Sequence, residues 1–265
     1  MGILNITPDS FSDGGKFLDQ GSAVKQALQM VEDGADIIDI GGESTRPGSE
    51  RVSASQQVDR IIPVMRELVR VLPDGFPLSI DTTRAAVAEE AIMVGASIIN
   101  DISAGEDDLG MFPLAARTNT EIILMHKRGT PATMQDNPVY GDVVTEVCSY
   151  LLDRAAAAVD AGVDKHNITV DPGMGFGKTL EHNLQLLTSL DSLVATGYPV
   201  LLGASRKNFL KKLSLSDDSR ELAGATCATT VLGVSAGARI LRVHDVKQNR
   251  QALDVTWAFR VSLEA

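Results

Sequence analysis

Polar side chains end each of eight short apolar runs along this chain, and helix-length stretches separate the runs. A buried strand needs no polar residue at its end for stability, whereas in a parallel barrel that edge is where the active site is built. Eight such ends on one rim are typical of an enzyme. The side chains concerned are Asn5, Asp39 with Glu43, Asp81, Asn100 with Asp101, His126, Asp171, Ser205 with Lys207, and Arg242 with His244.

Asp81, Asn100 and Asp171 supply two carboxylates and one amide at predicted strand ends. A buried carboxylate must be paired or hydrogen-bonded, or its burial costs folding free energy. Because a carboxylate accepts two N–H bonds from an amino-pyrimidine edge, we expect the three side chains to recognise such a heterocycle. The alternative for Asp81 is a helix N-cap.

The segment 171–178, DPGMGFGK, leaves a strand and contains three glycines. It matches neither the dinucleotide-binding fingerprint nor the P-loop. One interpretation is a tight turn that needs glycine at positive φ. The carboxylate of Asp171 at its start favours the other, in which the glycines let the backbone approach a flat ligand.

Arg242 and His244 alternate with Val243, so both side chains can point to the same side. A following helix N-terminus would complete an anion site, and phosphate sites in barrels often follow strands seven and eight. Ser205 and Lys207 would lie beside it. We expect Arg206, between them, to be a solvated surface charge.

Two loops rich in glycine, proline and polar residues, 7–15 and 42–49, are of the kind that close over a substrate. Arg46 can hold a carboxylate or phosphate through two parallel hydrogen bonds. Phe11, in so polar a loop, indicates an aromatic contact with a ligand. The amide oxygen of Asn5 can ligate a hard cation.

The elements that must position these residues alternate between strand and helix. A helix followed by glycine and then an apolar run occurs at 33–40, 94–100, 161–170 and 236–243, which is typical of a capped helix entering a buried strand. Further strands are predicted at 2–6, 78–81, 122–125 and 200–203, and helices at 53–72, 143–161 and 180–196.

Eight strand–helix units in 265 residues predict an α/β fold, a closed (β/α)8 TIM barrel forming a single domain over 1–265. An open doubly wound sheet is the rival architecture, but eight units without a break in composition favour closure. A hydrophobic content of 44% is enough for one large core.

The chain carries 24 Lys and Arg against 35 Asp and Glu, a formal net charge of −11. This balance argues against nucleic-acid partners and anionic membrane surfaces. No apolar run is long enough to cross a bilayer, and the first residues lack the pattern of a signal peptide. We therefore expect a cytoplasmic protein with no membrane partner.

Eight segments, in order, resemble the motifs of the dihydropteroate synthase family: GILNITPDSFSDGG, GGESTRPG, SIDT, INDISAG, LMHKRGTP, DPGMGFGKT, GASRKNFL and RILRVHDV. The resemblance implies a (β/α)8 barrel that condenses 6-hydroxymethyl-7,8-dihydropterin pyrophosphate with p-aminobenzoate, giving 7,8-dihydropteroate and pyrophosphate for folate biosynthesis. It also implies Mg²⁺ as cofactor, these two small molecules as substrates, and a homodimer.

The resemblance assigns roles residue by residue. The pterin would be held by Asp81, Asn100, Asp171 and Lys207, with Met125 and Phe176 packed near it. The pyrophosphate would be bound by Arg242, His244 and Asn5, and Asn5 would also contact Mg²⁺. The pocket would be lined by Thr45, and the p-aminobenzoate would be framed by Phe11, Arg46, Pro47 and Ser205. Asp81, Lys207, Arg242 and His244 would carry the catalysis.

We hypothesise an SN1-like substitution, in which pyrophosphate leaves before the arylamine attacks and Asp81 stabilises the cation. Three other functions stay open. A pterin-dependent methyltransferase has the same barrel but needs no pyrophosphate-binding residues. A Schiff-base aldolase would use Lys207 as its nucleophile, and a non-catalytic pterin-binding protein would have lost turnover.

Overall fold

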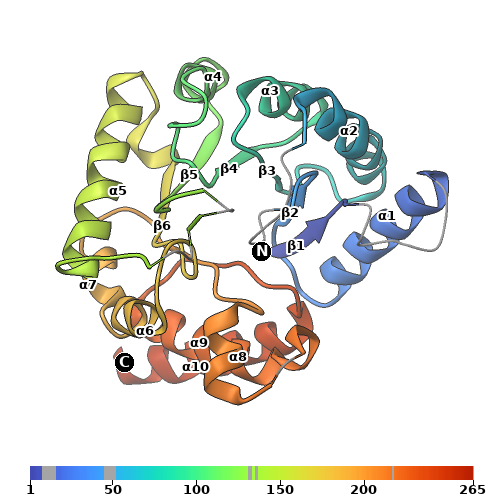
Figure 1. Cartoon of the computed structure of the whole chain (residues 1–265). Coiled ribbons are helices and arrows are strands. Elements are labelled where there is room, and N and C mark those ends of the chain that lie inside the picture. The colour runs from blue at the N-terminus through green and yellow to red at the C-terminus, as the bar shows by residue number, and fades with distance from the viewer. Residues whose placement is uncertain (8–15, 45–51, 131–132, 135–136, 217, 265) are drawn as a thin grey trace.

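Parallel strands form the centre of the molecule and helices surround them (Figure 1). The computed structural model describes residues 1–7, 16–44, 52–130, 133–134, 137–216 and 218–264. Within these ranges the strands are β1 (Gly2–Asn5), β2 (Ile38–Gly41), β3 (Leu78–Asp81), β4 (Ile98–Asp101), β5 (Glu121–Met125), β6 (Ile168–Asp171), β7 (Leu201–Leu202) and β8 (Ile240–Leu241).

The strands close into a barrel in chain order. Strands β1 to β6 form one parallel sheet, and β7 pairs with β8. Parallel bridges at Val170–Val200 and Gly2–Val243 join the two sheets on both sides. At the second junction the Ile3 amide donates to the Val243 carbonyl at 3.0 Å. The predicted closed barrel is confirmed, and the open sheet is excluded.

The helices follow the strands on the outside of the ring. They are α1 (Lys16–Glu32), α2 (Ala54–Val71), α3 (Ala85–Val94), α4 (Met111–Thr118), α5 (Val143–Asp160), α6 (Leu180–Thr188), α7 (Leu190–Val194), α8 (Asn208–Ser214), α9 (Ala223–Ala236) and α10 (Val246–Glu264), with 3₁₀ turns η2 (Lys165–Asn167) and η3 (Ser219–Glu221). The predicted helices 53–72 and 143–161 match α2 and α5 within one residue at each end.

The prediction of one helix over 180–196 was wrong. The structure has two, α6 and α7, which meet at Ser189 (φ −112°, ψ 27°). The hydroxyl of Thr188 donates to the carbonyls of Leu184 and Gln185, each at 3.0 Å. Such bonds compete with the backbone hydrogen bonds of a helix and often bend it.

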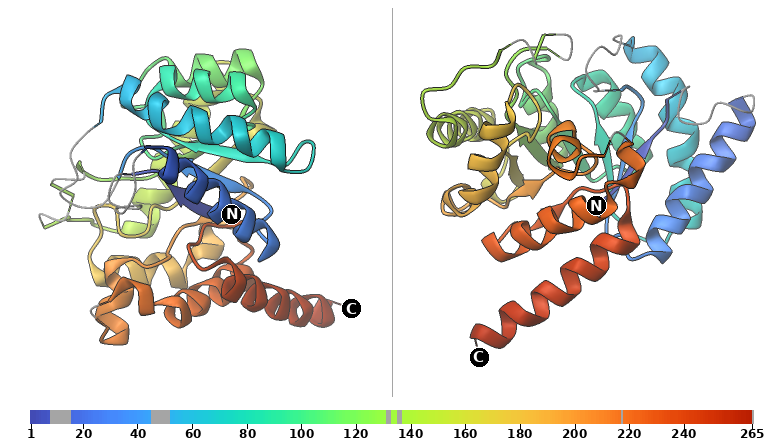
Figure 2. Two further views of the ribbon diagram at one scale, coloured as in Figure 1. Left: turned by 90° about the vertical axis from the view of Figure 1, so that its right-hand side faces the viewer. Right: turned by 60° about the horizontal axis from the view of Figure 1, so that its bottom comes forward.

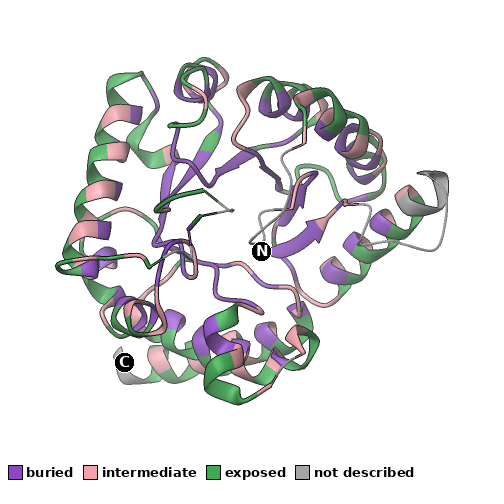
Figure 3. Cartoon of the chain, viewed as in Figure 1, coloured by how far each residue is buried: buried purple, intermediate pink, exposed green. Residues whose placement is uncertain are grey.

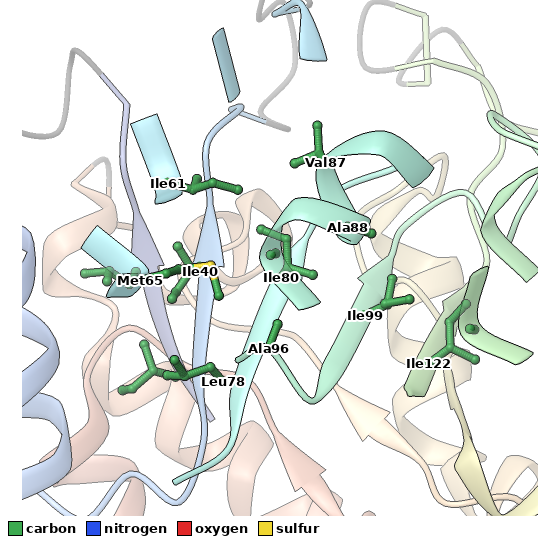
Figure 4. Close-up of a cluster of buried hydrophobic side chains, with 14 of the residues drawn as sticks. Ile40, Ile61, Met65, Leu78, Ile80, Val87, Ala88, Ala96, Ile99 and Ile122 are labelled. Carbon is green, nitrogen blue, oxygen red and sulfur yellow. The ribbon is translucent and has the colours of Figure 1, made fainter. Parts of the chain in front are cut away.

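The core lies mainly between the strands and the helices. Ile40, Ile80 and Ile99 point outward from β2, β3 and β4 and pack with Met65 of α2 and Ala88 of α3 (Figure 4). Most strand residues are buried while the outer helix surfaces are exposed (Figure 3). Because side chains alternate along a strand, the residues between these isoleucines face into the barrel.

A smaller apolar cluster fills the barrel interior. Ile98, Ile123 and Leu201 are buried there, with Ile37 and Ile240 packed against them. These are the positions that alternate with the outward-facing core residues, so they form the floor on which the site is built. Within the described helices, none is both long and apolar enough to span a bilayer.

Candidate active site

A layer of mostly polar side chains lies above the apolar floor. Each residue of this layer lies two positions further along its strand than a residue of the apolar floor, because alternate side chains of a strand share a face. In this way Ile37, Ile98, Ile123, Leu201 and Ile240 are followed by Asp39, Asn100, Met125, Gly203 and Arg242. Strand register places Asn5, Asp81 and Asn100 side by side, pairs Asp171 with Met125, and places Asp39 beside Ser79, two residues before Asp81.

Arg242 joins the carboxylates of two other strands. Its Nε donates to Oδ2 of Asp39 and its Nη2 to Oδ2 of Asp81, both at 2.6 Å. Nδ2 of Asn100 donates to the same oxygen of Asp39 at 3.0 Å. The predicted pterin-binding residues Asp81 and Asn100 are thus connected to the predicted pyrophosphate-binding Arg242. The notion of Asp81 as a helix N-cap is not borne out, since Arg84 occupies that position of α3.

Burial dominates the electrostatics of Asp81, whose residue is 8% exposed. Loss of hydration raises the pKa of its carboxyl to about 7; the positive charge of Arg242 opposes this rise, and the negative charges of Asp39, Asp101 and Glu43 add to it. A carboxyl group with a pKa near neutrality, held in a cavity, is characteristic of a functional site.

The charges of Asp171 and Lys207 attract each other in the same site. Burial lowers the pKa of Lys207 to about 8, against the attraction of Asp171. Burial likewise raises the pKa of Asp171, against the attraction of Lys207. The ammonium group of Lys207 lies 4.6 Å from the centre of the Phe176 ring and donates to the Met174 carbonyl. Lys207 therefore connects the predicted pterin-binding residues Asp171 and Phe176.

Two positions of the glycine-rich loop require glycine because neighbouring backbone lies too close for a Cβ. A Cβ on Gly173 (φ 66°) would lie 1.9 Å from the His126 carbonyl oxygen, and one on Gly177 (φ 65°) would lie 2.3 Å from that of Arg128. At these two positions the tight-turn interpretation is correct, because the loop packs against the end of β5. Gly175 (φ 80°) instead faces the side chain of Lys207.

Lys178, at the end of this loop, has a role that the sequence analysis did not foresee. Its side chain is buried, and Nζ lies 2.9 Å from Nδ1 of His126, 3.0 Å from the Phe176 carbonyl and 3.4 Å from the His126 carbonyl. Burial lowers the pKa of Lys178 well below its ordinary range, and that of His126 to about 3. Lys178 thus fastens the loop to β5 and makes His126 a structural partner.

His244 and Ser205 contact each other at the other side of the site. Oγ of Ser205 lies 3.0 Å from Nδ1 of His244 and accepts the backbone N–H of His244 at 3.2 Å. This arrangement lets the hydroxyl donate to Nδ1, which makes Nε2 the N–H donor of the neutral ring.

The prediction that Arg206 is a solvated charge was wrong. Its guanidinium forms a two-bond ion pair with Asp245, at 2.5 and 3.0 Å. Arg206 has a φ of 57°, a conformation that costs a residue with a side chain about 1–3 kcal/mol. The ion pair holds the loop after β7 against the start of α10, next to the contact between Ser205 and His244. Asp245 was not singled out, because only the tertiary structure brings it near Arg206.

A cavity of about 1020 Å³ opens over these groups. It is lined by Asn5, Asp81, Phe176, Ser205, Lys207, Arg242 and His244, together with residues of the glycine-rich loop and of α8. Asn100, Met125 and Asp171 are buried and do not appear among its lining residues. Asn5 and Asp81 therefore line one cavity together with the basic residues Lys207, Arg242 and His244. Phe11, Thr45, Arg46 and Pro47 lie outside the described residues.

The model of the family described as pterin-binding enzymes matches residues 1–244, more than nine-tenths of the chain. The chain belongs to the pterin-binding enzyme family. Its relatives in that family include the dihydropteroate synthase of Bacillus subtilis (strain 168), 48% identical over 248 residues, which cover 94% of this chain and 84% of the relative.

Solved structures of the family are similar over nearly the whole chain. A Xanthomonas albilineans dihydropteroate synthase with 4-aminobenzoic acid superposes with a TM-score of 0.92 at 42% identity, covering 98% of this chain and 92% of the other. The enzyme from the same organism in complex with 7,8-dihydropteroate gives a TM-score of 0.89 at 39% identity, with the same coverage of both chains. This pterin-binding enzyme thus shares both its sequence and its barrel with them.

Proposed function

We propose that this protein is a dihydropteroate synthase that condenses 6-hydroxymethyl-7,8-dihydropterin pyrophosphate with p-aminobenzoate, giving 7,8-dihydropteroate and pyrophosphate. The observation that carries the proposal is the position of the Arg242 side chain. This side chain connects the carboxylate of Asp81 to an edge of hydrogen-bond donors formed with His244, over one cavity. That arrangement suits a flat ring beside a departing diphosphate, and the names and bound ligands of the relatives support it. A cytoplasmic location is part of the proposal and rests on sequence alone.

The chemistry follows from where charge develops. The bond between the pterin methylene carbon and the ester oxygen breaks, and its electron pair leaves with the diphosphate. Arg242 and His244 offer donors to the departing oxygens, and preorganised donors at such a point are often the largest contribution to catalysis. The carboxylate of Asp81 stabilises the positive charge on the pterin. The arylamine nitrogen then forms the C–N bond and loses a proton, as an SN1-like substitution requires.

Mg²⁺ is proposed as the cofactor, with Asn5 as its protein ligand. The side chain of Asn5 lines the cavity together with Arg242 and His244. Among the described residues, no group of three or more His, Cys, Asp or Glu side chains could hold a metal. This fits an ion held mainly by substrate phosphates and water, which is the usual coordination of Mg²⁺ in proteins. When bound, it would neutralise charge on the diphosphate.

Magnesium-dependent release of pyrophosphate on adding p-aminobenzoate to the pterin pyrophosphate tests the function. We expect release and dihydropteroate in equal amounts. Methyl transfer without release would favour the methyltransferase, and a borohydride-trapped adduct at Lys207 would favour the aldolase. Pterin binding without any turnover would identify a non-catalytic binding protein.

The kcat/KM for the pterin pyrophosphate is expected to depend on pH as a bell-shaped curve. Asp81 acts as a carboxylate, so activity falls as the pH drops through its pKa of about 7. Lys207 acts as an ammonium ion, so activity also falls as the pH rises through its pKa of about 8. Initial rates in overlapping buffers measure both limbs, since kcat/KM reports groups of the free enzyme. A flat profile through neutrality would contradict the assignment.

A homodimer is proposed through the C-terminal part of α10. This part projects from the barrel beside α9 (Figure 2) and exposes Val255, Trp257, Phe259 and Val261. At 100° per residue, Val255 and Phe259 lie on the side opposite Trp257 and Val261. Exposed apolar side chains gathered on one segment often mark an interaction surface, and a second copy of this chain would cover them.

Replacing both Trp257 and Phe259 with aspartate is expected to convert the dimer into a monomer, because two charges would be buried without partners. Light scattering coupled to size-exclusion chromatography measures the mass. Leu109→Asp is the matched control and should leave the dimer intact. Leu109 is an apolar residue that is 85% exposed and lies just before α4, away from α10. A wild-type protein that is monomeric at every concentration would refute the proposal.

A further inference from the structure

Asp39 is the central acceptor of the polar layer, yet it does not line the cavity. It has no exposed surface. Its Oδ2 accepts two hydrogen bonds, from Nε of Arg242 at 2.6 Å and from Nδ2 of Asn100 at 3.0 Å. Its Oδ1 has no partner among the described residues. One oxygen thus contacts both the arginine at the predicted diphosphate site and the amide at the predicted pterin site.

These two contacts determine where the partners can point. The guanidinium of Arg242 is planar, and Asp39 and Asp81 hold two of its N–H groups on different nitrogens. Two such bonds fix both the plane and its rotation, so the remaining N–H groups are aimed at the cavity that Arg242 lines. The bond from Nδ2 to Asp39 likewise fixes which end of the Asn100 amide presents its oxygen.

Fold stability alone does not call for a carboxylate at this position. Replacing buried ion pairs with apolar side chains is often neutral or stabilising. The register partner of Asp39 on β3 is Ser79, which is also fully buried and whose hydroxyl has no partner in the described structure. Asp39 therefore differs from Ser79 in forming two hydrogen bonds to residues of the site.

We propose that Asp39 is a positioning residue of the reaction, which orients Arg242 toward the diphosphate and Asn100 toward the pterin without touching either. This inference rests on the proposed function. It makes recognition of the ring and of the leaving group depend on one buried carboxylate. A residue that acts in this way changes the KM for the pterin pyrophosphate, which carries both groups, and leaves the KM for p-aminobenzoate nearly unchanged.

Steady-state kinetics of Asp39→Asn against both substrates test the inference. We expect KM for the pterin pyrophosphate to rise and its kcat/KM to fall about 30- to 100-fold, with KM for p-aminobenzoate within about twofold of wild type. Ser79→Ala is the matched control, at the same depth on the adjacent strand, and should match wild type. Equal changes toward both substrates, or an effect no larger than that of Ser79→Ala, would overturn the inference.

A double-mutant cycle separates positioning through Arg242 from general disruption. Lysine at position 242 keeps the charge but lacks Nε, so Asp39→Asn should cost less than about threefold in the Arg242→Lys background. The same cost in both backgrounds would exclude action through Arg242. Should Asp39→Asn fail to fold, Asp39→Leu supplies an apolar side chain of suitable size, and a wild-type KM in that variant overturns the proposal.

Failure of the inference is distinguishable from failure of the proposed function. A wild-type protein that releases no pyrophosphate contradicts the function itself. A wild-type protein that is active while Asp39→Asn behaves like Ser79→Ala contradicts only the role of Asp39.

Discussion

Replacing Asp81 with asparagine is expected to lower kcat by about 10²–10³-fold, the loss usually seen when one preorganised electrostatic group is removed from an active site. Asparagine keeps the size of the side chain and one acceptor oxygen, but it removes the negative charge that would stabilise the pterin cation. Asp81 lines the cavity and is bound to Arg242 at 2.6 Å, so its charge lies at the site itself.

Pyrophosphate release under saturating substrates measures this effect, and circular dichroism checks that the variant is folded. Ser79→Ala, two residues earlier on the same strand, is the control and should retain its turnover. A rate for Asp81→Asn near that of wild type would remove the cation-stabilising role. The same holds for Asp81→Ala, which is expected to lose turnover by a similar factor while folding remains largely intact.

Replacing Arg242 with glutamine is expected to impair both catalysis and stability. The kcat/KM for the pterin pyrophosphate should fall by at least about 10³-fold, because the leaving group loses its charged donor. The free energy of unfolding should fall by about 3–5 kcal/mol, since Asp39 and Asp81 would be left as buried carboxylates without a cation. Both effects arise from one side chain that joins β8 to β2 and β3.

Kinetics and urea unfolding measure the two losses separately. Arg154→Gln is the control for stability, because Arg154 is a partly buried arginine of α5 whose Nε donates to the Ala104 carbonyl outside the cavity. It should lose far less stability and keep its activity. An Arg242→Gln variant as stable as wild type would mean that Asp39 and Asp81 need no compensation, contrary to the ion pairs observed.

The ion pairs of Arg242 with two carboxylates also bear on which ligands the site selects. In this structure its guanidinium is held by Asp39 and Asp81, and Lys207 lies near Asp171. Arg242 is thus paired with acidic groups before any substrate is present. A ligand that carries both a pterin and a diphosphate can satisfy all of these groups together, whereas a free anion meets an arginine whose charge is already compensated.

The strands, most helices and the rim residues could be predicted from the sequence because their signals are local. Runs such as 78–81 and 98–101 are buried along their whole length, and before the second run Gly95 marks the end of a helix. In a parallel barrel, the position of Asp81, Asn100 and Asp171 at strand ends then suffices to place them on one rim. The family motifs pointed to the same fold and chemistry.

The tertiary structure alone decided which of these residues contact each other. Arg242 pairs with Asp39 and Asp81 across 203 and 161 residues of sequence, and only barrel closure brings β8 beside the interior of β2 and β3. For the same reason the partner of Arg206 and the neighbour that demands Gly173 were unforeseen. Sequence patterns report the periodicity of an element and the ends of its strands; distances between side chains depend on register and closure, which bring together residues far apart in the chain.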